Sequence, residues 1–434
     1  MLKHLQEHIT QDFSFLKGKK LLLAISGGID SMVLLDLFSK LDFKIAIAHC
    51  NFQLRGSESD EDEEFVKIKS EKLKVKSFIK KFDTKIYSEQ NKLSIQQAAR
   101  ELRYNWFEEL MITKGYDYVL TAHHLEDSLE TFLINFTRGT GIEGLTGIPE
   151  VNNKIIRPLL IFSRAAIENY AKENNMQWRE DSSNASEKYF RNKIRHQIIP
   201  VLKELNPSLL QSYKNTITHL QQTNDLAKEA VSQQYSIIAQ EKDNQITFDI
   251  PKLKSLNNYK AYLFEWLKSY QFSAWEDIYD LVDSNSGKQV FSNEYRLLKD
   301  REFLILTKKN EEQKNYFEIN EEQTEIDFPK KLRFCNLDYI IQPSQSSIFV
   351  DKEKLKFPLV LRKWQEGDYF YPSGMNGKKK VSKYFKDEKF SLIDKENTWI
   401  LCSQDAIIWI VNNRADQRFL ATNNTKTILN ITTI

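Results

Sequence analysis

The chain has 434 residues, which is too long for a single hydrophobic core, so two or three domains are expected. Lysine and arginine total 62 against 60 aspartates and glutamates, and the net charge of +2 by itself indicates no nucleic-acid partner. Three cysteines without a CxxC pairing are too few for a disulfide framework. No apolar run spans a membrane and the N-terminus lacks an apolar leader, so we expect a cytoplasmic protein without a membrane partner.

A glycine turn near the N-terminus is the first segment that indicates chemistry. The apolar residues 21–25 predict a buried strand, two adjacent glycines turn the chain, and an apolar helical pattern follows. Adjacent glycines admit a ligand close to the backbone, and the N–H groups of a helix start favour an anion. The string GxxxxGK[ST] is absent, and SGGIDS instead resembles the pyrophosphate loop of the N-type ATP pyrophosphatases. The residues of this predicted phosphate loop are Ser26, Gly27, Gly28, Ile29, Asp30 and Ser31.

Strand and helix patterns alternate along the first half of the chain. The strand-like segments after the first are residues 44–49, 76–82 and 116–123. Repeated β-α-β units predict an α/β fold with a doubly wound parallel sheet and its ligand at the carboxyl ends of the strands. Three polar segments follow strands, so we expect them to converge on one crevice; they are residues 26–31, 49–56 and 123–130.

The helix predicted at 94–114, with Ser94 as its N-cap, carries Arg100 and Arg103 three residues apart. The pair suits a clamp on phosphate, and it suits equally well a solvated pair balanced by neighbouring glutamates. An acidic run at 57–65 is interpreted as a solvated helix start that the helix dipole favours.

The segment 121–148 holds the densest polar chemistry. Two histidines end a strand, and the following helix places Glu126, Asp127 and Glu130 within about one turn. Like charges four residues apart cost roughly 0.2–0.5 kcal/mol, so Glu126 with Glu130 calls for a cation such as Mg²⁺ or a cationic substrate. The zinc motif HExxH is absent. The GxGxxG string at 139–144 follows a helix rather than a strand, so it predicts a flexible loop and no NAD site.

Two basic segments have the composition of RNA contacts. Residues 180–196 begin with an acidic turn, EDSSN, and then interleave basic side chains with Tyr189. Residues 361–387 combine a lysine run with tyrosines and phenylalanines. A capped, solvated helix start and a solvated lysine-rich hairpin are the respective structural alternatives.

The second half of the chain is predicted to be helical first and β-rich last. The pattern is helical over 208–242 and again over 259–283. A strand pair follows with its turn at Lys299 and Asp300, and alternating segments such as 406–411 predict a small β-rich domain.

Taken in order, the motifs resemble those of the bacterial tRNA(Ile)-lysidine synthetase family. They are SGGIDS, HCNFQLRG, ARELRY, AHHLEDSLET, RGTGIEGL, RPLL, EDSSN and YFRNKIRHQIIPVL. The resemblance implies a ligase that uses ATP and Mg²⁺ to adenylate the C2 oxygen of the wobble cytidine in the CAU anticodon of an isoleucine tRNA. Free L-lysine then displaces AMP and gives lysidine.

The resemblance also implies roles for individual residues. The phosphate loop would hold pyrophosphate, and Asp30 or Asp127 would carry Mg²⁺. Arg100 and Arg103 would neutralise charge on the transferred phosphoryl group or bind the RNA backbone. Asp127 and Glu130 would receive the lysine ammonium and help to deprotonate the amine, with His123 as a second candidate base. The candidate tRNA contacts are Asn51, Arg55, Arg103, Arg191, Arg195, Lys379 and Lys380.

Three positions depart from the family pattern. Phe52 stands where a second histidine is usual, and Glu126 and Ser128 stand where an aspartate and a glutamine are usual. Phe52 would stack on a base instead. The expected domains are a PP-loop ATP-binding catalytic domain at 1–205, a mainly helical tRNA-binding domain at 206–310, a linker with connecting strands at 311–350 and a C-terminal tRNA-binding domain at 351–434.

Rival functions stay open at this point. A tRNA thiolase generally needs paired cysteines, amidotransferase-linked synthetases need no basic C-terminal module, and a noncatalytic tRNA-binding protein would not need the carboxylate cluster. The sequence leaves the oligomeric state open, with a homodimer as one option.

Overall fold

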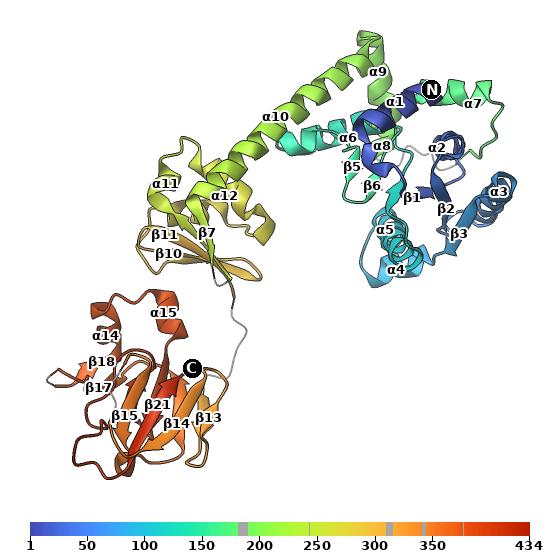
Figure 1. Cartoon of the computed structure of the whole chain (residues 1–434). Helices are drawn as coiled ribbons and strands as arrows, with labels where there is room; N and C mark the ends of the chain where they lie inside the picture. The colour runs from blue at the N-terminus through green and yellow to red at the C-terminus, as the bar shows by residue number, and fades with distance from the viewer. Residues whose placement is uncertain (181–189, 243, 310–315, 341–343, 376) are drawn as a thin grey trace. The chain divides into compact units, whose positions relative to one another are not determined.

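The computed structural model describes the chain except residues 181–189, 243, 310–315, 341–343 and 376. It divides into two compact units, Met1–Glu229 and Ala230–Ile434, whose boundary falls within the helix α10 (Leu209–Ile238). In Figure 1 the N-terminal unit is a sheet surrounded by helices, and most strands of the C-terminal part lie after α13 (Trp275–Leu281).

A six-stranded sheet organises the N-terminal unit in the order β3-β2-β1-β4-β6-β5. Its strands are β1 (Lys20–Ala24), β2 (Lys44–Asn51), β3 (Lys76–Lys81), β4 (Tyr118–Leu120), β5 (Val151–Asn152) and β6 (Ile155–Ile156). All neighbours are parallel except the edge strand β5, which is antiparallel to β6. Because the chain winds outward from β1 in both directions, the ligand is expected beyond the carboxyl ends of β1 and β4.

Helices cover both faces of this sheet, which explains why its central strand is apolar from Leu21 to Ala24. Leu21 and Leu23 pack in a core with α1, α2 and α7, whereas Leu22 packs on the opposite face with Trp106 and Phe107 of α5. The helices of this unit are α1 (Leu2–Asp12), α2 (Ile29–Ser39), α3 (Ser57–Leu73), α4 (Thr84–Gln90), α5 (Ile95–Lys114), α6 (Leu125–Arg138), α7 (Arg164–Glu173), α8 (Phe190–Lys193) and α9 (Ile199–Leu205).

The predicted doubly wound α/β fold is confirmed. The N-cap predicted at Ser94 is confirmed as a capping box: the Ser94 hydroxyl accepts from the Gln97 N–H at 3.3 Å, and the Gln97 side chain accepts from the Ser94 N–H at 3.0 Å. The strand predicted at 116–123 is shorter, because the chain leaves the strand at Leu120 to enter α6.

The Ala230–Ile434 unit contains a five-stranded antiparallel sheet in the order β7-β8-β11-β10-β9. These strands are β7 (Ala239–Lys242), β8 (Gln245–Asp249), β9 (Gln289–Phe291), β10 (Tyr295–Asp300) and β11 (Phe303–Lys308). They share a core with the end of α10, α11 (Ile250–Lys254), α12 (Tyr259–Leu267) and α13.

Two details of this region differ from the sequence prediction. Residues 239–242 form a strand and do not continue the helix, because they pair with β8. The hairpin turn lies at Arg301 and Glu302, two residues later than predicted, since Lys299 and Asp300 still pair with β11. The Lys299 side chain is buried and donates to the Val282 carbonyl at 3.1 Å, which holds it within the strand.

The predicted β-rich C-terminal part is confirmed. Leu361 and Leu401 of one four-stranded sheet share a core with Leu332 and Ile431 of the other. The first sheet is β12 (Tyr316–Ile319), β16 (Leu359–Lys363), β19 (Trp399–Ser403) and β20 (Ala406–Ile410). The second is β13 (Glu325–Ile326), β14 (Leu332–Leu337), β21 (Ile428–Thr433) and β15 (Ser347–Asp351). A short hairpin, β17 (Tyr369–Phe370) and β18 (Lys379–Lys380), leads into α14 (Val381–Asp387), and α15 (Leu392–Asn397) follows.

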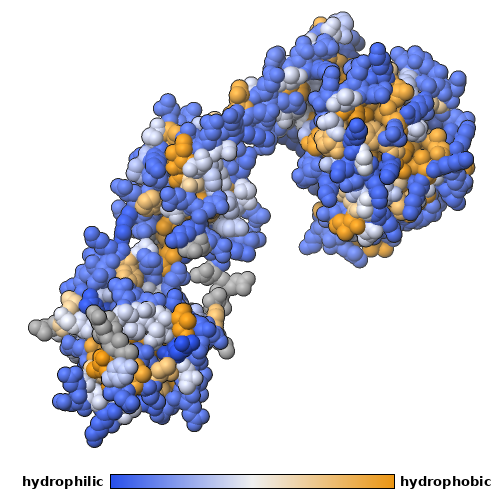
Figure 2. All heavy atoms as spheres, in the orientation of Figure 1, coloured by the Kyte–Doolittle hydropathy of each residue, from blue (hydrophilic) through white to orange (hydrophobic). Residues whose placement is uncertain are grey.

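Within the described ranges, no helix is both long and apolar enough to cross a membrane. The face drawn in Figure 2 is mostly hydrophilic, with hydrophobic residues at separate places on both units.

One glycine is required where the loop after α6 returns to the sheet. Gly147 has φ +74°, and a Cβ on it would lie 2.4 Å from the Ser128 hydroxyl oxygen and 2.8 Å from the Tyr213 hydroxyl oxygen. Those two hydroxyls bond each other at 2.9 Å, and Ser128 also accepts from the Ile148 N–H at 3.0 Å. The close packing therefore ties α6, α10 and this loop together.

We predict that Gly147→Ala lowers the free energy of unfolding by about 2–4 kcal/mol, since it adds overpacking to backbone strain. Chemical denaturation of the purified chain measures this change. Gly139→Ala is the matched control, because Gly139 also has φ +74° but an added Cβ there meets no atom within 4 Å. The control should lose only about 1 kcal/mol, and equal losses would contradict the packing argument.

Candidate functional site

The predicted phosphate loop connects β1 to α2 and is organised by one hydroxyl. Ser31 Oγ accepts from the N–H groups of Ser26 and Gly27, both at 3.2 Å, and donates to the Gly28 carbonyl at 2.8 Å. Gly27 has φ +95°, a conformation that favours glycine. Gly28 is the N-cap of α2, so the backbone of this turn lies at the positive end of the helix dipole.

Asp30, in the first turn of α2, has one paired and one unpaired carboxylate oxygen. Its Oδ2 accepts from Arg164 Nη1 at 2.6 Å, and its Oδ1 is buried without a hydrogen-bond partner among the described residues. Burial raises the pKa of Asp30, against the opposing charges of His124 and Arg164. A buried, unpaired carboxylate oxygen beside a phosphate loop fits Mg²⁺, which prefers oxygen ligands and bridges carboxylates to phosphates.

The carboxylates at the start of α6 are neutralised by basic groups from distant segments. Glu130 is fully buried; its Oε1 lies 2.5 Å from Arg195 Nε and its Oε2 lies 3.0 Å from Arg191 Nε. Arg195 Nη2 also lies 3.1 Å from Asp127 Oδ1. Arg191 is on α8, and Arg195 is on the π-helical turn η4 (Ile194–Ile198) that follows it. The cation that the sequence called for is therefore supplied, in this structure, by the chain's own arginines.

Arg164 joins the end of the phosphate loop to the start of α6, because its side chain pairs with Asp30 and its backbone N–H donates to Glu126. Burial alone would lower the pKa of His124, but the hydrogen bond to Glu126 and the charges of Asp127 and Asp30 raise it. Burial opposes ionisation of Asp127, and the charges of His124 and Arg195 lower its pKa. His123 is different: burial lowers its pKa to about 4, so it is neutral at pH 7 and able to accept a proton.

Glu126, the first of the departures from the family pattern, contacts the protein itself. Its Oε2 accepts from the Arg164 N–H at 2.9 Å and lies 3.3 Å from His124 Nδ1. Burial opposes its ionisation, yet these partners lower the pKa of Glu126 to about 2. Its extra methylene thus joins α6 to the N-terminus of α7.

The other two departures also have structural partners. The Ser128 hydroxyl bonds the Tyr213 hydroxyl and accepts from the Ile148 N–H, so it holds the loop that contains Gly147. The ring of Phe52 stacks on Phe82 with centroids 5.7 Å apart, and the Arg103 guanidinium lies 5.2 Å from the Phe52 centroid.

The loop after β2 is held by the acidic start of α3. The Asn51 side chain is buried and donates to Asp60 at 3.0 Å and Glu63 at 2.7 Å. Arg55 Nη2 lies 2.6 Å from Asp62, which also accepts from Arg179 Nε at 3.0 Å. The acidic run is thus more than a solvated helix start, because Asp62 is buried between two arginines.

Sequence reasoning missed Arg157, Arg164 and Arg179, although each contacts or flanks this crevice. Arg164 pairs with Asp30, and Arg179 reaches Asp62 and lies beside the phosphate loop, where its N–H donates to the Gly27 carbonyl at 3.0 Å. Arg164 and Arg179 pair with carboxylates more than 100 residues away in the chain, so spacing carried no signal for them. Arg157 begins the RPLL motif, which was the one signal that could have indicated it. The EDSSN turn and Tyr189 fall largely on residues 181–189, which lie outside the described part of the chain.

The predicted basic, aromatic patch of the C-terminal part is only partly at the surface. Lys378 Nζ lies 3.4 Å from the centroid of the exposed Tyr369 ring, and Lys380 is exposed. Lys379 pairs with Asp387 at 2.9 Å. Two aromatic residues assigned to the patch, Tyr384 and Phe385, are instead buried in the core beneath α14.

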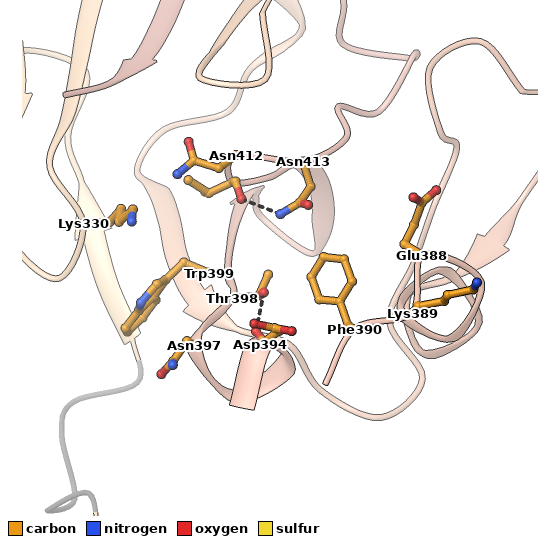
Figure 3. A pocket seen from close by; sticks show the side chains of 11 residues that line it. Lys330, Glu388, Lys389, Phe390, Asp394, Asn397, Thr398, Trp399, Asn412 and Asn413 are labelled. Carbon is orange, nitrogen blue, oxygen red and sulfur yellow. Dashed lines mark hydrogen bonds between the residues drawn. The ribbon is translucent and has the colours of Figure 1, made fainter. Parts of the chain in front are cut away.

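A cavity of about 420 Å³ also lies in the C-terminal part, with none of the carboxylate cluster in its lining. Figure 3 shows its wall: Phe390 and Trp399 stand on either side, and Thr398 lies between them. The dashed lines are the hydrogen bonds from Thr398 to the Asp394 carbonyl and from the Asn413 amide to the Val411 carbonyl. Its mixed charges, Lys330 and Lys389 against Glu388 and Asp394, indicate no single ligand class.

Comparison with known proteins covers almost the whole chain. A PP-loop domain matches residues 1–202, a TilS substrate binding domain matches 240–309 and a TilS substrate C-terminal domain matches 359–431. The tRNA(Ile)-lysidine synthase of Parabacteroides distasonis is 39% identical over 421 residues, covering 95% of each chain. That of Bacteroides thetaiotaomicron is 38% identical and covers 97% of each, and that of Porphyromonas gingivalis strain W83 is 35% identical, covering 93% of this chain and 92% of the relative.

The low pKa of Glu126 makes the stability of this site dependent on pH. A carboxyl whose pKa is lowered by folding stabilises the protein above its unfolded pKa, near 4.5, and loses that contribution as the pH falls toward about 2. Glu126→Gln is expected to lower the free energy of unfolding at pH 7 by about 3 kcal/mol. Urea unfolding between pH 3 and 7 should show the difference from the unmodified chain narrowing below pH 4.5.

Glu109→Gln is the matched control for this measurement, because Glu109 pairs with Lys80 at the surface. Its effect should stay within about 0.5 kcal/mol at every pH. A difference for Glu126→Gln that is independent of pH would show that the charge of Glu126 is not what stabilises the junction.

Proposed function

Because the chain belongs to the tRNA(Ile)-lysidine synthase family, we propose that it joins free L-lysine to C2 of the wobble cytidine in the CAU anticodon of an isoleucine tRNA. ATP is the energy source, and the products are the lysidine-containing tRNA, AMP and pyrophosphate. The observation that carries this proposal is a pair of carboxylates beside a phosphate loop, those of the half-buried Asp127 and the buried Glu130. Such a site brings a nucleotide phosphate and a cationic substrate to one crevice.

The first step is adenylation of the cytidine. The C2 oxygen attacks the α-phosphorus of ATP, the bond between the α- and β-phosphates breaks, and pyrophosphate leaves. Ser26, Gly27, Gly28, Ile29 and Ser31 hold the departing phosphates through the turn at the start of α2. Mg²⁺ held by Asp30 or Asp127 would neutralise charge on those phosphates. Arg100 is a candidate for either of two roles: neutralising charge on the transferred phosphoryl group or binding the RNA backbone.

The second step replaces the new leaving group. The lysine amine attacks C2, the bond from C2 to the adenylate oxygen breaks, and AMP leaves with the bond electrons. The proton lost by the amine passes to Asp127 or Glu130, or to His123. His123 suits a base because burial keeps it neutral. The carboxylate pair suits an ammonium ligand because it already binds the guanidinium of Arg195.

Contacts with tRNA are proposed for residues around the crevice and in the C-terminal part. They are Asn51, Arg55, Arg103, Arg191, Arg195, Lys379 and Lys380. Lys380 and Arg191 are exposed, which supports contact with a backbone phosphate. Asn51 and Arg55 are held by carboxylates of α3, so their support for RNA binding is the shape of the loop they stabilise.

Sulfur transfer is disfavoured by the state of the cysteines. Burial raises the pKa of Cys50, at the end of β2, to about 12, so its thiol is protonated at neutral pH. Cys402 is buried and Cys335 is exposed, and both lie in the other unit. Ligation of an amine needs no thiolate, and it matches the carboxylate cluster.

The deciding experiment incubates the purified chain with ATP, Mg²⁺, labelled lysine and a CAU-anticodon isoleucine tRNA transcript. We expect label in the RNA with release of AMP. Asp127→Asn should lower incorporation at least about 100-fold, since it removes the charge that receives the amine. The asparagine oxygen can still accept from the His124 N–H, so α6 keeps its start.

Glu109→Gln serves as the control, since Glu109 is exposed and outside the crevice; its rate should equal that of the unmodified chain. Release of AMP without label in the RNA would show that the nucleophile is not lysine. Absence of AMP would contradict the assignment of the phosphate loop to ATP.

A further inference from the structure

Another cavity lies in the N-terminal unit, beside the crevice, and three arginines line it. Its volume is about 340 Å³. Arg100, Arg157 and Arg191 line it together with His123, and apolar contact comes from Ile134, Ile148 and Pro149. Its lining includes no aspartate or glutamate, in contrast to the carboxylate cluster next to it.

Arg157 is the unusual member of this lining. Only 4% of it is exposed, yet its Nε–H has no hydrogen-bond partner among the described residues. Its Nη1 donates to the Pro149 carbonyl at 2.7 Å, and the Tyr104 hydroxyl lies beside the guanidinium. Across the described ranges, no carboxylate oxygen lies within 4 Å of Arg157 or of Arg100.

The positive charge of this cavity is therefore not balanced by carboxylates of the described residues. Arg191 pairs with Glu130. The buried Arg157 and the nearby Arg100 have no carboxylate partner among the described residues. A buried guanidinium without a counter-ion is costly, and a free N–H in a polar cavity adds to that cost. Both costs are removed when an anion with several oxygen acceptors enters, and the planar guanidinium fork matches phosphate.

We propose that the cavity at Arg157 is a binding site for a phosphate group of the RNA backbone, distinct from the phosphate loop that receives ATP. This inference rests on the proposed function, because it takes RNA as the substrate. Arg157 and Arg100 bind the phosphate oxygens, and Ile134, Ile148 and Pro149 contact the attached sugar or base. None of residues 26–31 lines the cavity, which separates it from the phosphates of ATP.

The structure of the cavity makes Arg157 a positioning residue rather than a catalytic one. It is fixed by Pro149 in the loop that Ser128 and Gly147 hold against α6. A phosphate bound there is held at a fixed position relative to His123, which also lines the cavity. The nucleotide attached to that phosphate would then be presented to the crevice.

The test measures binding of the full chain to the CAU-anticodon tRNA transcript, without ATP or lysine, over a range of salt concentrations. Arg157→Gln should weaken binding about 10-fold and should reduce the slope of log K against log salt by about 0.7–0.9, the value for one lost phosphate contact. The affinity for ATP, measured separately in the absence of RNA, should change less than about twofold.

Arg100→Gln is the second variant, because Arg100 is exposed and its loss spares the buried core; its salt slope should also fall, and it decides the question if Arg157→Gln does not fold. Lys114→Gln, at the far end of the same helix α5, is the control and should keep both affinity and slope.

Three results would overturn the proposal. Loss of ATP affinity with an unchanged RNA slope would assign the cavity to a phosphate of ATP. An unchanged slope and affinity in folded variants would remove the cavity as a phosphate site. An equal change of slope in Lys114→Gln would show that the loss of any positive charge has this effect. The binding assay contains neither lysine nor ATP. Its result therefore does not depend on whether the chain catalyses the ligation reaction.

Discussion

The arrangement of the crevice depends on how buried charge is balanced at the start of α6. Four carboxylates, those of Asp30, Glu126, Asp127 and Glu130, lie in or beside it, and each contacts a basic or donor group from another segment. Removing carboxylates from water is costly unless such partners are present. The partners come from the start of α7 and from the α8 and η4 helical turns, so charge balance also determines how these elements pack on the sheet.

The same requirement explains two features that otherwise seem unrelated. Glu126, longer than the residue usual in the family, contacts the N-terminus of α7, where a negative charge is favoured by the helix dipole. Arg157 is the opposite case: it is buried, but the described residues offer it no carboxylate. Within the described part of the crevice, the Arg157 guanidinium is therefore the buried charge that a ligand would neutralise.

Chemistry and architecture are divided between the units. The N-terminal unit holds the phosphate loop, the carboxylates and the arginine-lined cavity, and its parallel sheet brings them to the carboxyl ends of β1 and β4. The Ala230–Ile434 unit is built from antiparallel sheets with separate cores. Its surface lysines, including Lys378 and Lys380, suit contact with RNA phosphates, while its cavity at Trp399 has mixed charge.

The sequence by itself determined the doubly wound fold, the phosphate loop, the capping box at Ser94 and the position of Asp127 and Glu130 on one helix. These features depend on neighbouring residues, through strand and helix periodicity, glycine conformation and spacing of three or four residues. Only the tertiary structure decided which cations meet the carboxylates, that Asp62 is buried between Arg55 and Arg179, and that Tyr384 and Phe385 belong to a core. The physical reason is that burial and ion pairing join residues as far apart in the chain as Asp62 and Arg179. Packing therefore determines these contacts, and the local sequence does not.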